Sequence, residues 1–126
     1  MPFIISRVNR PISRDQEVEL KAWMGKAIAL VPGKSEEYLL LGFEDNCRLW
    51  LRGDDSEPTA YIEANIFGNE GHYGYDAFTA EVTMMFHEVH GVAPENVYIN
   101  FTDIPDWGAG GRNYDRNRFF RGAGYA

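Results

Sequence analysis

The sequence predicts an α/β (α+β) fold: a tandem β-α-β repeat whose four-stranded mixed sheet carries two helices on one face. Short apolar runs of strand-forming residues alternate with two stretches whose apolar residues recur at helical spacing. The chain also matches itself when displaced by 58 residues, so the repeats cover about 2–45 and 59–103. Because a helix separates the two strands of each unit, we expect those strands to pair in parallel.

The first repeat opens with an apolar strand at residues 3–5. Ser13 and Gln16 are spaced as a capping box, which predicts a helix that continues to Pro32-Gly33. Residues 38–43 then predict a strand, and residues 47–51 predict its hairpin partner after a polar turn.

The second repeat follows the same plan. A strand is predicted at residues 61–67, a helix that ends at Gly91 follows a glycine-containing loop, and residues 97–101 predict the last strand. The displacement by 58 residues aligns Phe3 with Tyr61, Ile4 with Ile62, Leu20 with Phe78, Met24 with Val82, Ala27 with Met85, Ile28 with Phe86, Val31 with Val89, Gly33 with Gly91, Phe43 with Phe101 and Asp45 with Asp103.

Two helices on one face leave the other face of the sheet uncovered. The alternation in the strands predicts apolar residues there, which have to be buried. Self-association through the sheets is the simplest way to bury them.

The composition excludes several classes of partner. Lys and Arg number 12 and Asp and Glu number 19, so the net charge of −7 argues against nucleic acid and anionic membranes. No apolar run approaches the length of a spanning helix, and residues 6–10 are too polar for a signal peptide. Cys47 is the only cysteine, which excludes an intrachain disulfide and favours a reduced, cytoplasmic setting.

Pro2 is the first candidate for chemistry. Methionine is normally trimmed before a residue this small, which would leave a secondary amine at the terminus. An α-amino group titrates at about 7.7–8.0, and an apolar, cationic pocket would lower that pKa toward the range of a general base. The alternative is that Pro2 only begins an edge strand, where its missing N–H does no harm.

Pro2 and three segments, at residues 33–38, 56–58 with 66–68, and 94–103, resemble motifs of the macrophage migration inhibitory factor family of the tautomerase superfamily. Residues 94–103 resemble its proline-x-x-valine/isoleucine-tyrosine-isoleucine-asparagine strand. Residues 56–58 with 66–68 resemble its serine-glutamate-proline and serine-isoleucine-glycine segment. Residues 33–38 resemble its glycine-lysine-proline-x-x-tyrosine turn, and Pro2 stands where the family has its amino-terminal proline. The resemblance covers roughly residues 2–105.

The resemblance implies a homotrimer in which the sheets form a central barrel, with active sites between subunits. It also implies a cofactor-independent keto–enol tautomerase that acts on phenylpyruvate-like 2-oxo acids or their enols, with Pro2 as general base and acid. The substrate-binding residues it implies are Lys34 beside the substrate carboxylate, the Ile66 backbone, Tyr38 at the rim, and Tyr98 and Asn100 from the neighbouring subunit.

The sequence departs from the family at two places. Thr59 and Ile62 replace the Cys-x-x-Cys pair of cytokine members, so thiol oxidoreductase activity is not expected. After a tautomerase-like domain at 1–106, the tail at 107–126 is longer and rich in glycine and arginine. It is either a mobile, solvated end, or it folds over the pocket through Trp107, Arg112, Tyr114 or Phe119 and brings an arginine to a carboxylate.

Two other functions stay open at this point. The tail is also similar to the decarboxylase and dehalogenase branches of the superfamily, which keeps decarboxylase, hydratase or dehalogenase chemistry as an alternative. A cytokine-like binding protein without catalysis is the other. His87 and His90 lie three apart at a helix end, but no carboxylate completes a ligand set, so neither a metal nor another cofactor is expected.

Overall fold

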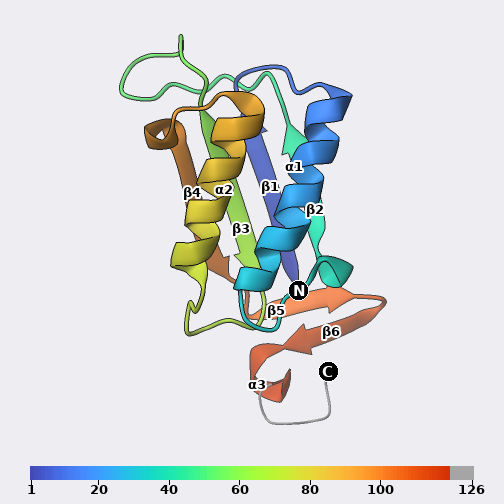
Figure 1. Ribbon diagram of the computed structural model, residues 1–126. Helices are drawn as coiled ribbons and strands as arrows, with labels where there is room; N and C mark the ends of the chain where they lie inside the picture. The colour runs from blue at the N-terminus through green and yellow to red at the C-terminus, as the bar shows by residue number, and fades with distance from the viewer. Residues whose placement is uncertain (120–126) are drawn as a thin grey trace.

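In the computed structural model, which describes residues 1–119, two helices lie against one face of a four-stranded sheet (Figure 1). The chain runs through β1 (Pro2–Val8), α1 (Arg14–Ala27), β2 (Leu40–Glu44), β3 (Ala60–Ile66), α2 (Tyr75–His90), β4 (Val97–Asp103), β5 (Asp106–Ala109), β6 (Arg112–Asp115) and α3 (Arg116–Phe119). Short 3-10 helices occupy Ile28–Leu30, Glu36–Tyr38 and Pro94–Asn96.

The sheet joins the two repeats through its central strands. Its strand order is β2-β1-β3-β4, with β1 parallel to β2, β3 parallel to β4, and β1 antiparallel to β3. Both ends of β3 lie 58 residues after the corresponding ends of β1. The predicted mixed sheet and tandem β-α-β repeat are therefore confirmed.

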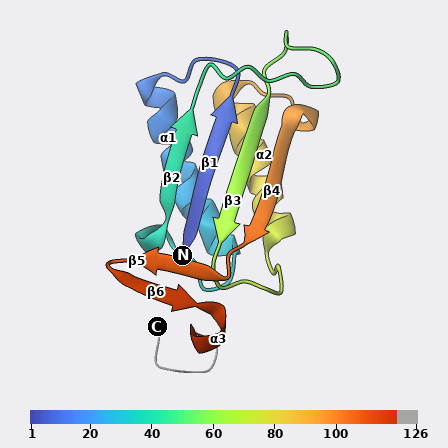
Figure 2. The ribbon, with the colours of Figure 1, turned by 180° about the vertical axis from the view of Figure 1, so that it is seen from behind.

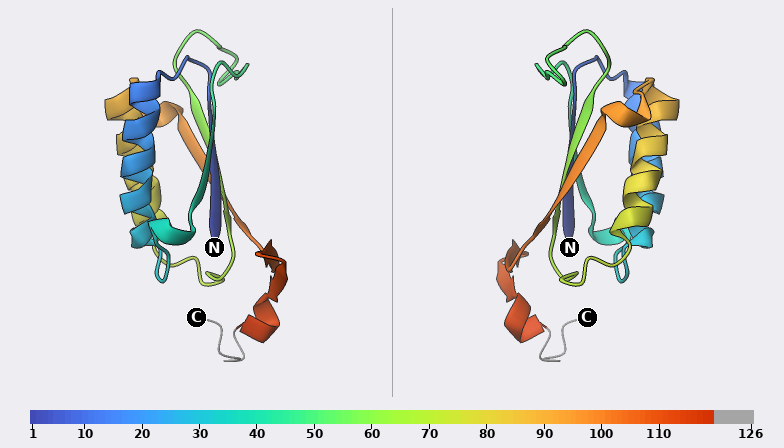
Figure 3. Two further views of the ribbon diagram at one scale, coloured as in Figure 1. Left: turned by 90° about the vertical axis from the view of Figure 1, so that its right-hand side faces the viewer. Right: turned by 90° about the vertical axis from the view of Figure 1, so that its left-hand side faces the viewer.

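The core fills the space between the sheet and the helices, which cover only one side (Figure 3). Alternate residues of β1 and β3 are buried, as expected when one face of a strand packs on a core. Leu20 and Met24 from α1 meet Phe78 and Phe86 from α2 in this layer, all of them fully buried.

The helix termini follow the local sequence signals. The Ser13 side chain accepts the Gln16 N–H while the Gln16 side chain accepts the Ser13 N–H, so the predicted capping box is confirmed. Gly91 ends α2 with a φ of 68°, a left-handed conformation that glycine adopts at low cost.

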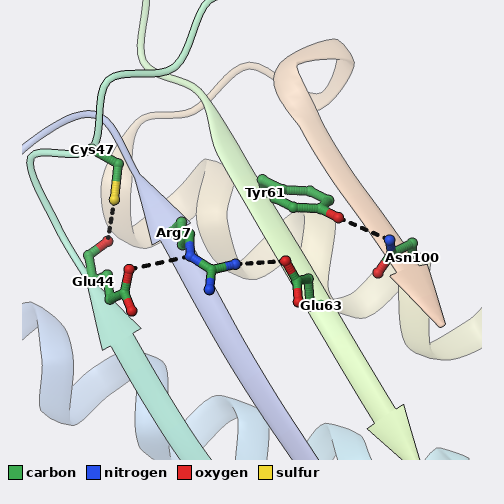
Figure 4. Close-up of polar contacts among 6 residues, drawn as sticks. All are labelled: Arg7, Glu44, Cys47, Tyr61, Glu63 and Asn100. Atoms are coloured by element: carbon green, nitrogen blue, oxygen red, sulfur yellow. Dashed lines mark hydrogen bonds and ion pairs between the residues drawn. The ribbon is translucent and has the colours of Figure 1, made fainter. Parts of the chain in front are cut away.

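Figure 2 shows the face of the sheet that the helices leave uncovered. This face is only partly apolar, which corrects the prediction. Phe3 and Ile5 lie together on it, close to Gly42. The next residue of β1 on this face is Arg7, which donates to Glu63 Oε1 at 2.6 Å and to Glu44 Oε2 at 3.1 Å (Figure 4). The sequence analysis predicted an apolar strand here but not the charged residues that share this face.

Beyond the ion pairs, the Asn100 side chain donates to the Tyr61 hydroxyl at 2.8 Å on the same face (Figure 4). Part of the face is thus polar and paired within the chain, while Phe3, Ile5 and Leu40 form an apolar part.

The predicted strand at residues 47–51 is wrong. The chain turns at Asn46, which has a φ of 55°, and the Cys47 N–H donates to the Val8 carbonyl at 2.9 Å. The segment therefore crosses the end of β1 instead of folding back along β2. Within residues 1–119, the one bridge of this segment is the tight pair of Leu51 with Asp54.

The tail forms regular structure as far as residue 119, which favours the second of its two interpretations for this part. β5 and β6 pair in an antiparallel hairpin, and the turn at Gly110 and Gly111 has φ values of 59° and 81°. Two consecutive positive φ angles match the twist of a two-residue hairpin and favour glycine. Residues 120–126, which include Arg121, lie outside the described residues.

Arg116 attaches the hairpin to the rest of the protein. Its guanidinium lies 2.6 Å from Asp103 at the end of β4 and 3.2 Å from Glu70 in the loop after β3. The main-chain N–H of Arg116 donates to the Pro105 carbonyl at 2.9 Å. No helix in residues 1–119 is long and apolar enough to cross a membrane.

The start of α2 depends on a glycine. Gly74 has a φ of 79°, and a Cβ atom there would overlap the Leu30 carbonyl oxygen. We expect Gly74→Ala to lower the free energy of unfolding by about 3 kcal/mol, because left-handed strain and overpacking add. Gly91→Ala is the matched control, since Gly91 has a φ of 68° but open space around it, and should cost about 1 kcal/mol. Urea unfolding measures the free energy of unfolding of both variants. An equal loss of stability in the two would contradict the role of the Leu30 contact.

Candidate active site

A tight turn places Lys34 next to the end of β3. The Lys34 N–H donates to the Val31 carbonyl at 3.1 Å, and Gly33 has a φ of 76°. Proline followed by a glycine with positive φ is typical of a type II turn, so Pro32 and Gly33 explain the turn locally. The Lys34 side chain then reaches across to the second repeat.

Pro2 lies in an interior strand, so the edge-strand explanation does not apply to it. It is opposite Ile66, while Met1 and Phe67 exchange both of their hydrogen bonds, at 3.1 Å and 3.4 Å. In an antiparallel pair such bonded positions alternate with non-bonded ones. Pro2 therefore occupies a non-bonded position, where its missing N–H leaves no partner unsatisfied.

Two nitrogens converge on one carbonyl at this end of the sheet. Lys34 Nζ donates to the Phe67 oxygen at 2.8 Å and to the Gly68 oxygen at 3.4 Å. The terminal amine of Met1 donates to the same Phe67 oxygen at 3.4 Å. The turn after α1 and the start of β1 thus lie side by side, because both donate hydrogen bonds to the Phe67 carbonyl just after β3.

Both nitrogens hold their protons less strongly than usual. Burial, followed by the charge and hydrogen bonding of Lys34, lowers the pKa of the Met1 amine from 8.0 to about 5. Burial also lowers the pKa of Lys34. A terminal amine at this position is therefore neutral near pH 7 and able to accept a proton or attack an electrophile.

A cavity of about 410 Å³ opens beside these nitrogens. None of the described residues that line it is acidic, so its only charged groups are cationic or basic. It has the size of a small-molecule site. The lining residues are Met1, Gly33, Lys34, Tyr38, Phe67, Ala109, Gly110 and Tyr114.

The β5–β6 hairpin forms one wall of the cavity, as the second interpretation of the tail predicted in part. Ala109 pairs with Arg112 and Trp107 with Tyr114, so all four side chains belong to one face of the hairpin. Ala109 and Tyr114 line the cavity. The Arg112 guanidinium carbon lies 5.9 Å from the centre of the Tyr114 ring, one side chain away from the cavity.

The structure brings some of the predicted site residues together and not others. Lys34 and Tyr38 line the cavity, and Pro2 follows Met1, which also lines it. The Ile66 side chain is buried in the core, and its carbonyl accepts the Ile104 N–H at 3.0 Å. Tyr98 and Asn100 are alternate, exposed residues of β4, on the open face of the sheet. Their predicted roles need a neighbouring subunit and stay predictions.

Sequence reasoning did not find the main-chain groups that form part of the site. The Phe67 and Gly68 carbonyls, which hold Lys34, carry no side-chain signal. Ala109 and Gly110 were part of a glycine-rich tail, and only their place in a two-residue hairpin shows that they form a wall. The two consecutive glycines at 110 and 111 were a signal for that hairpin.

No group of three or more His, Cys, Asp or Glu within residues 1–119 is arranged to hold a metal ion. His87 instead uses Nδ1 in a 3.1 Å contact with the Val92 carbonyl oxygen, near the end of α2.

The terminal amine gives a direct test of this electrostatic environment. In the chain that retains Met1, we expect the amine to titrate near pH 5, as measured by NMR of a chain labelled at Met1. Lys34→Gln should raise that pKa because it removes a neighbouring positive charge, while burial keeps the pKa below 8.0. Lys26→Gln, at an exposed position on α1, is the control and should leave the titration unchanged. A wild-type titration near pH 8 would contradict the site geometry.

Comparison with known proteins shows the fold. No protein-family model matches the chain, and no curated protein does. The solved structure of Leishmania major MIF2 is 21% identical with a TM-score of 0.83, over 90% of this chain and 97% of that one. Toxoplasma gondii macrophage migration inhibitory factor is 21% identical with a TM-score of 0.78, over 89% and 99%. Pt0534, solved after inactivation by 2-oxo-3-pentynoate, is 12% identical with a TM-score of 0.76, over 86% and 93%. The chain therefore has the fold of the macrophage migration inhibitory factor proteins, as its sequence motifs predicted.

Proposed function

We propose that the chain, once Met1 is removed, is a cofactor-independent keto–enol tautomerase of phenylpyruvate-like 2-oxo acids. The observation that supports this most is the placement of the amino terminus beside a cavity that Lys34 also lines, where burial and the charge of Lys34 lower the pKa of the Met1 amine in the untrimmed chain. The same two causes would act on a Pro2 amine at this end of β1. The similarity in fold to Pt0534, which 2-oxo-3-pentynoate inactivates, adds support for a 2-oxo acid as ligand.

In the proposed mechanism, neutral Pro2 removes a proton from the carbon next to the substrate carbonyl. Lys34 attracts the substrate carboxylate and disfavours the prolyl ammonium. The prolyl ammonium then returns a proton to the other end of the enolate. The bonds of Lys34 to the Phe67 and Gly68 carbonyls do not involve Met1, so trimming does not remove its anchor.

The proposal includes a homotrimer. The open face of the sheet exposes Leu40 and Tyr98, which a neighbouring subunit would cover. Tyr98 and Asn100 would then complete the site of the adjacent subunit. On the same face, Arg7 is already paired with Glu44 and Glu63 within one chain, so a neighbouring subunit need not supply a partner for its guanidinium.

The first test is an ultraviolet assay of phenylpyruvate tautomerisation by the Met1-trimmed protein. We expect Pro2→Ala to lower kcat/KM by roughly 10²- to 10⁴-fold, the usual contribution of a positioned general base. Lys34→Gln should lower kcat/KM by raising KM, because the substrate carboxylate loses its cation. Lys26→Gln should have no effect. Light scattering checks that each variant keeps the mass of the wild type. A trimmed, folded wild type without activity would exclude the proposal.

Decarboxylase, hydratase or dehalogenase chemistry stays a second candidate because the hairpin borders the cavity and carries Arg112 on its cavity-facing side. This chemistry would use Arg112 to bind a carboxylate or the leaving group. Arg112→Gln should then abolish turnover of 3-halo- or 3-carboxyacrylates, while Arg14→Gln, at a distant exposed position, should not. Unchanged turnover in Arg112→Gln, or no turnover by the wild type, would exclude this candidate.

A further inference from the structure

We propose that a second cavity, at the opposite end of the sheet from the candidate active site, binds a small zwitterion of the α-amino acid class. The ligand carboxylate contacts Arg52, and the ligand ammonium group contacts Glu57. This inference goes beyond the tautomerase proposal, because it uses none of the residues assigned to that reaction and concerns a different class of ligand.

The second cavity lies where the loop after β2 meets the starts of β3 and β4 (Figure 1). Its volume of about 220 Å³ is below the range of roughly 300–1,000 Å³ that is typical of drug-sized ligands, so it suits a small molecule. Its polar lining includes both buried and exposed residues. The lining residues are Leu51, Arg52, Asp54, Glu57, Thr59 and Asn96.

The buried side chain of Asn96 keeps two opposite charges apart. Its oxygen accepts a hydrogen bond from Arg52, and its Nδ2 donates to Glu57 Oε2 and to the Pro58 carbonyl, each at 3.2 Å. Asn96 is only 2% exposed, and these bonds satisfy both ends of its amide. Within residues 1–119, neither Arg52 nor Glu57 forms an ion pair. The amide that lies between them therefore leaves both charges available to a ligand.

Both charged groups also keep hydrogen-bonding capacity. Among the described residues, the Arg52 guanidinium donates only to Asn96, although it has five N–H groups. The Glu57 carboxylate accepts at Oε2 and has no protein donor at Oε1 in the same part of the chain. A guanidinium binds a carboxylate through paired N–H groups, and a carboxylate oxygen accepts from an ammonium group. An α-amino acid carries a carboxylate and an ammonium group on one carbon, so a single small molecule can contact both residues.

Asp54 makes the charge of the cavity selective. Its two carboxylate oxygens accept the Ser56 N–H and the Ser56 hydroxyl, each at 2.9 Å, so the side chain is held in place. The lining thus carries one positive and two negative groups. Two carboxylates repel a ligand that is only an anion, and a ligand that is only a cation leaves Arg52 without a carboxylate. A zwitterion matches both signs.

A tight turn fixes the position of Arg52. Leu51 and Asp54 exchange both of their main-chain hydrogen bonds, at 2.9 Å and 3.0 Å. Between them, Arg52 has a φ of 53° and Gly53 a φ of 76°, two consecutive positive angles as in a two-residue hairpin. A left-handed conformation is unfavourable for arginine, and such positions are concentrated at ligand sites. The turn therefore preorganises the guanidinium above Asn96.

The test titrates the isotope-labelled full-length protein with alanine, propionate and ethylamine, and follows the side-chain amide of Asn96 by NMR. Propionate is alanine without its ammonium group, and ethylamine is alanine without its carboxylate. A hydrogen bond between charged groups contributes roughly a factor of ten or more to affinity. We therefore expect alanine to bind at least about tenfold more tightly than either of the other probes. This comparison uses the wild-type protein, so it does not depend on the folding of a variant.

Matched variants assign the two contacts. Arg52→Gln and Glu57→Gln should each weaken alanine binding roughly tenfold, because each removes one of the two charged partners. Arg48→Gln and Asp55→Asn are the controls and should leave the affinity unchanged. Each removes the same charge from an exposed position in the same loop, outside the lining of the cavity.

The inference is overturned if alanine binds no more tightly than propionate and ethylamine, or if none of the three probes shifts the Asn96 amide. Equal losses of affinity in Arg52→Gln and Arg48→Gln would also overturn it, because the effect would then be one of overall charge. None of these measurements involves Pro2 or Lys34. Failure of this inference is therefore distinguishable from failure of the tautomerase proposal.

Discussion

The antiparallel pairing of β1 with β3 is the interaction on which the candidate site depends. It joins the two repeats and sets Met1 opposite Phe67. Pro2 suits only a non-bonded position of this ladder, and a slip by one residue would also turn the buried side of β1 outward. The register thereby fixes where the amino terminus lies, within hydrogen-bonding distance of the carbonyl that also holds Lys34.

The protonation of the site is governed by two amines, those of Met1 and Lys34, which share the Phe67 carbonyl. Two amines compete for it in a partly buried place with no acidic residue among the lining groups described, so they cannot both keep their protons easily. Lys34 has the better acceptors and remains the cation, while the terminal amine becomes a neutral base. Whether that amine is secondary or primary depends on whether Pro2 or Met1 comes first.

The hairpin shows how distant segments complete the cavity. Arg116 ties it to Asp103 and Glu70, so the end of β4, the loop before α2 and the β5–β6 hairpin are held as one unit. With that anchor, the turn at Gly110 comes to lie beside Lys34 and Tyr38, which are far away in the sequence. The small residues Ala109 and Gly110 leave room in the cavity, and Tyr114 adds an aromatic surface.

Much of this architecture is local in origin and could be predicted from the sequence. Helical spacing, the Ser13 capping box, the stop at Gly91 and the repeat of 58 residues determined the helices, the strands and their parallel pairs. Pro2 and Lys34 were identified as candidates through motifs, and Pro32-Gly33 accounts for the turn that presents Lys34. The tertiary structure alone decided the rest, because it depends on contacts between segments that no local pattern describes. Residues 47–51 cross the end of β1 through a backbone bond to Val8, Arg7 pairs with Glu44 and Glu63 across three strands, and the Phe67 carbonyl gathers two amines. Backbone carbonyls are the same in every residue, so only the fold decides which of them becomes part of a site.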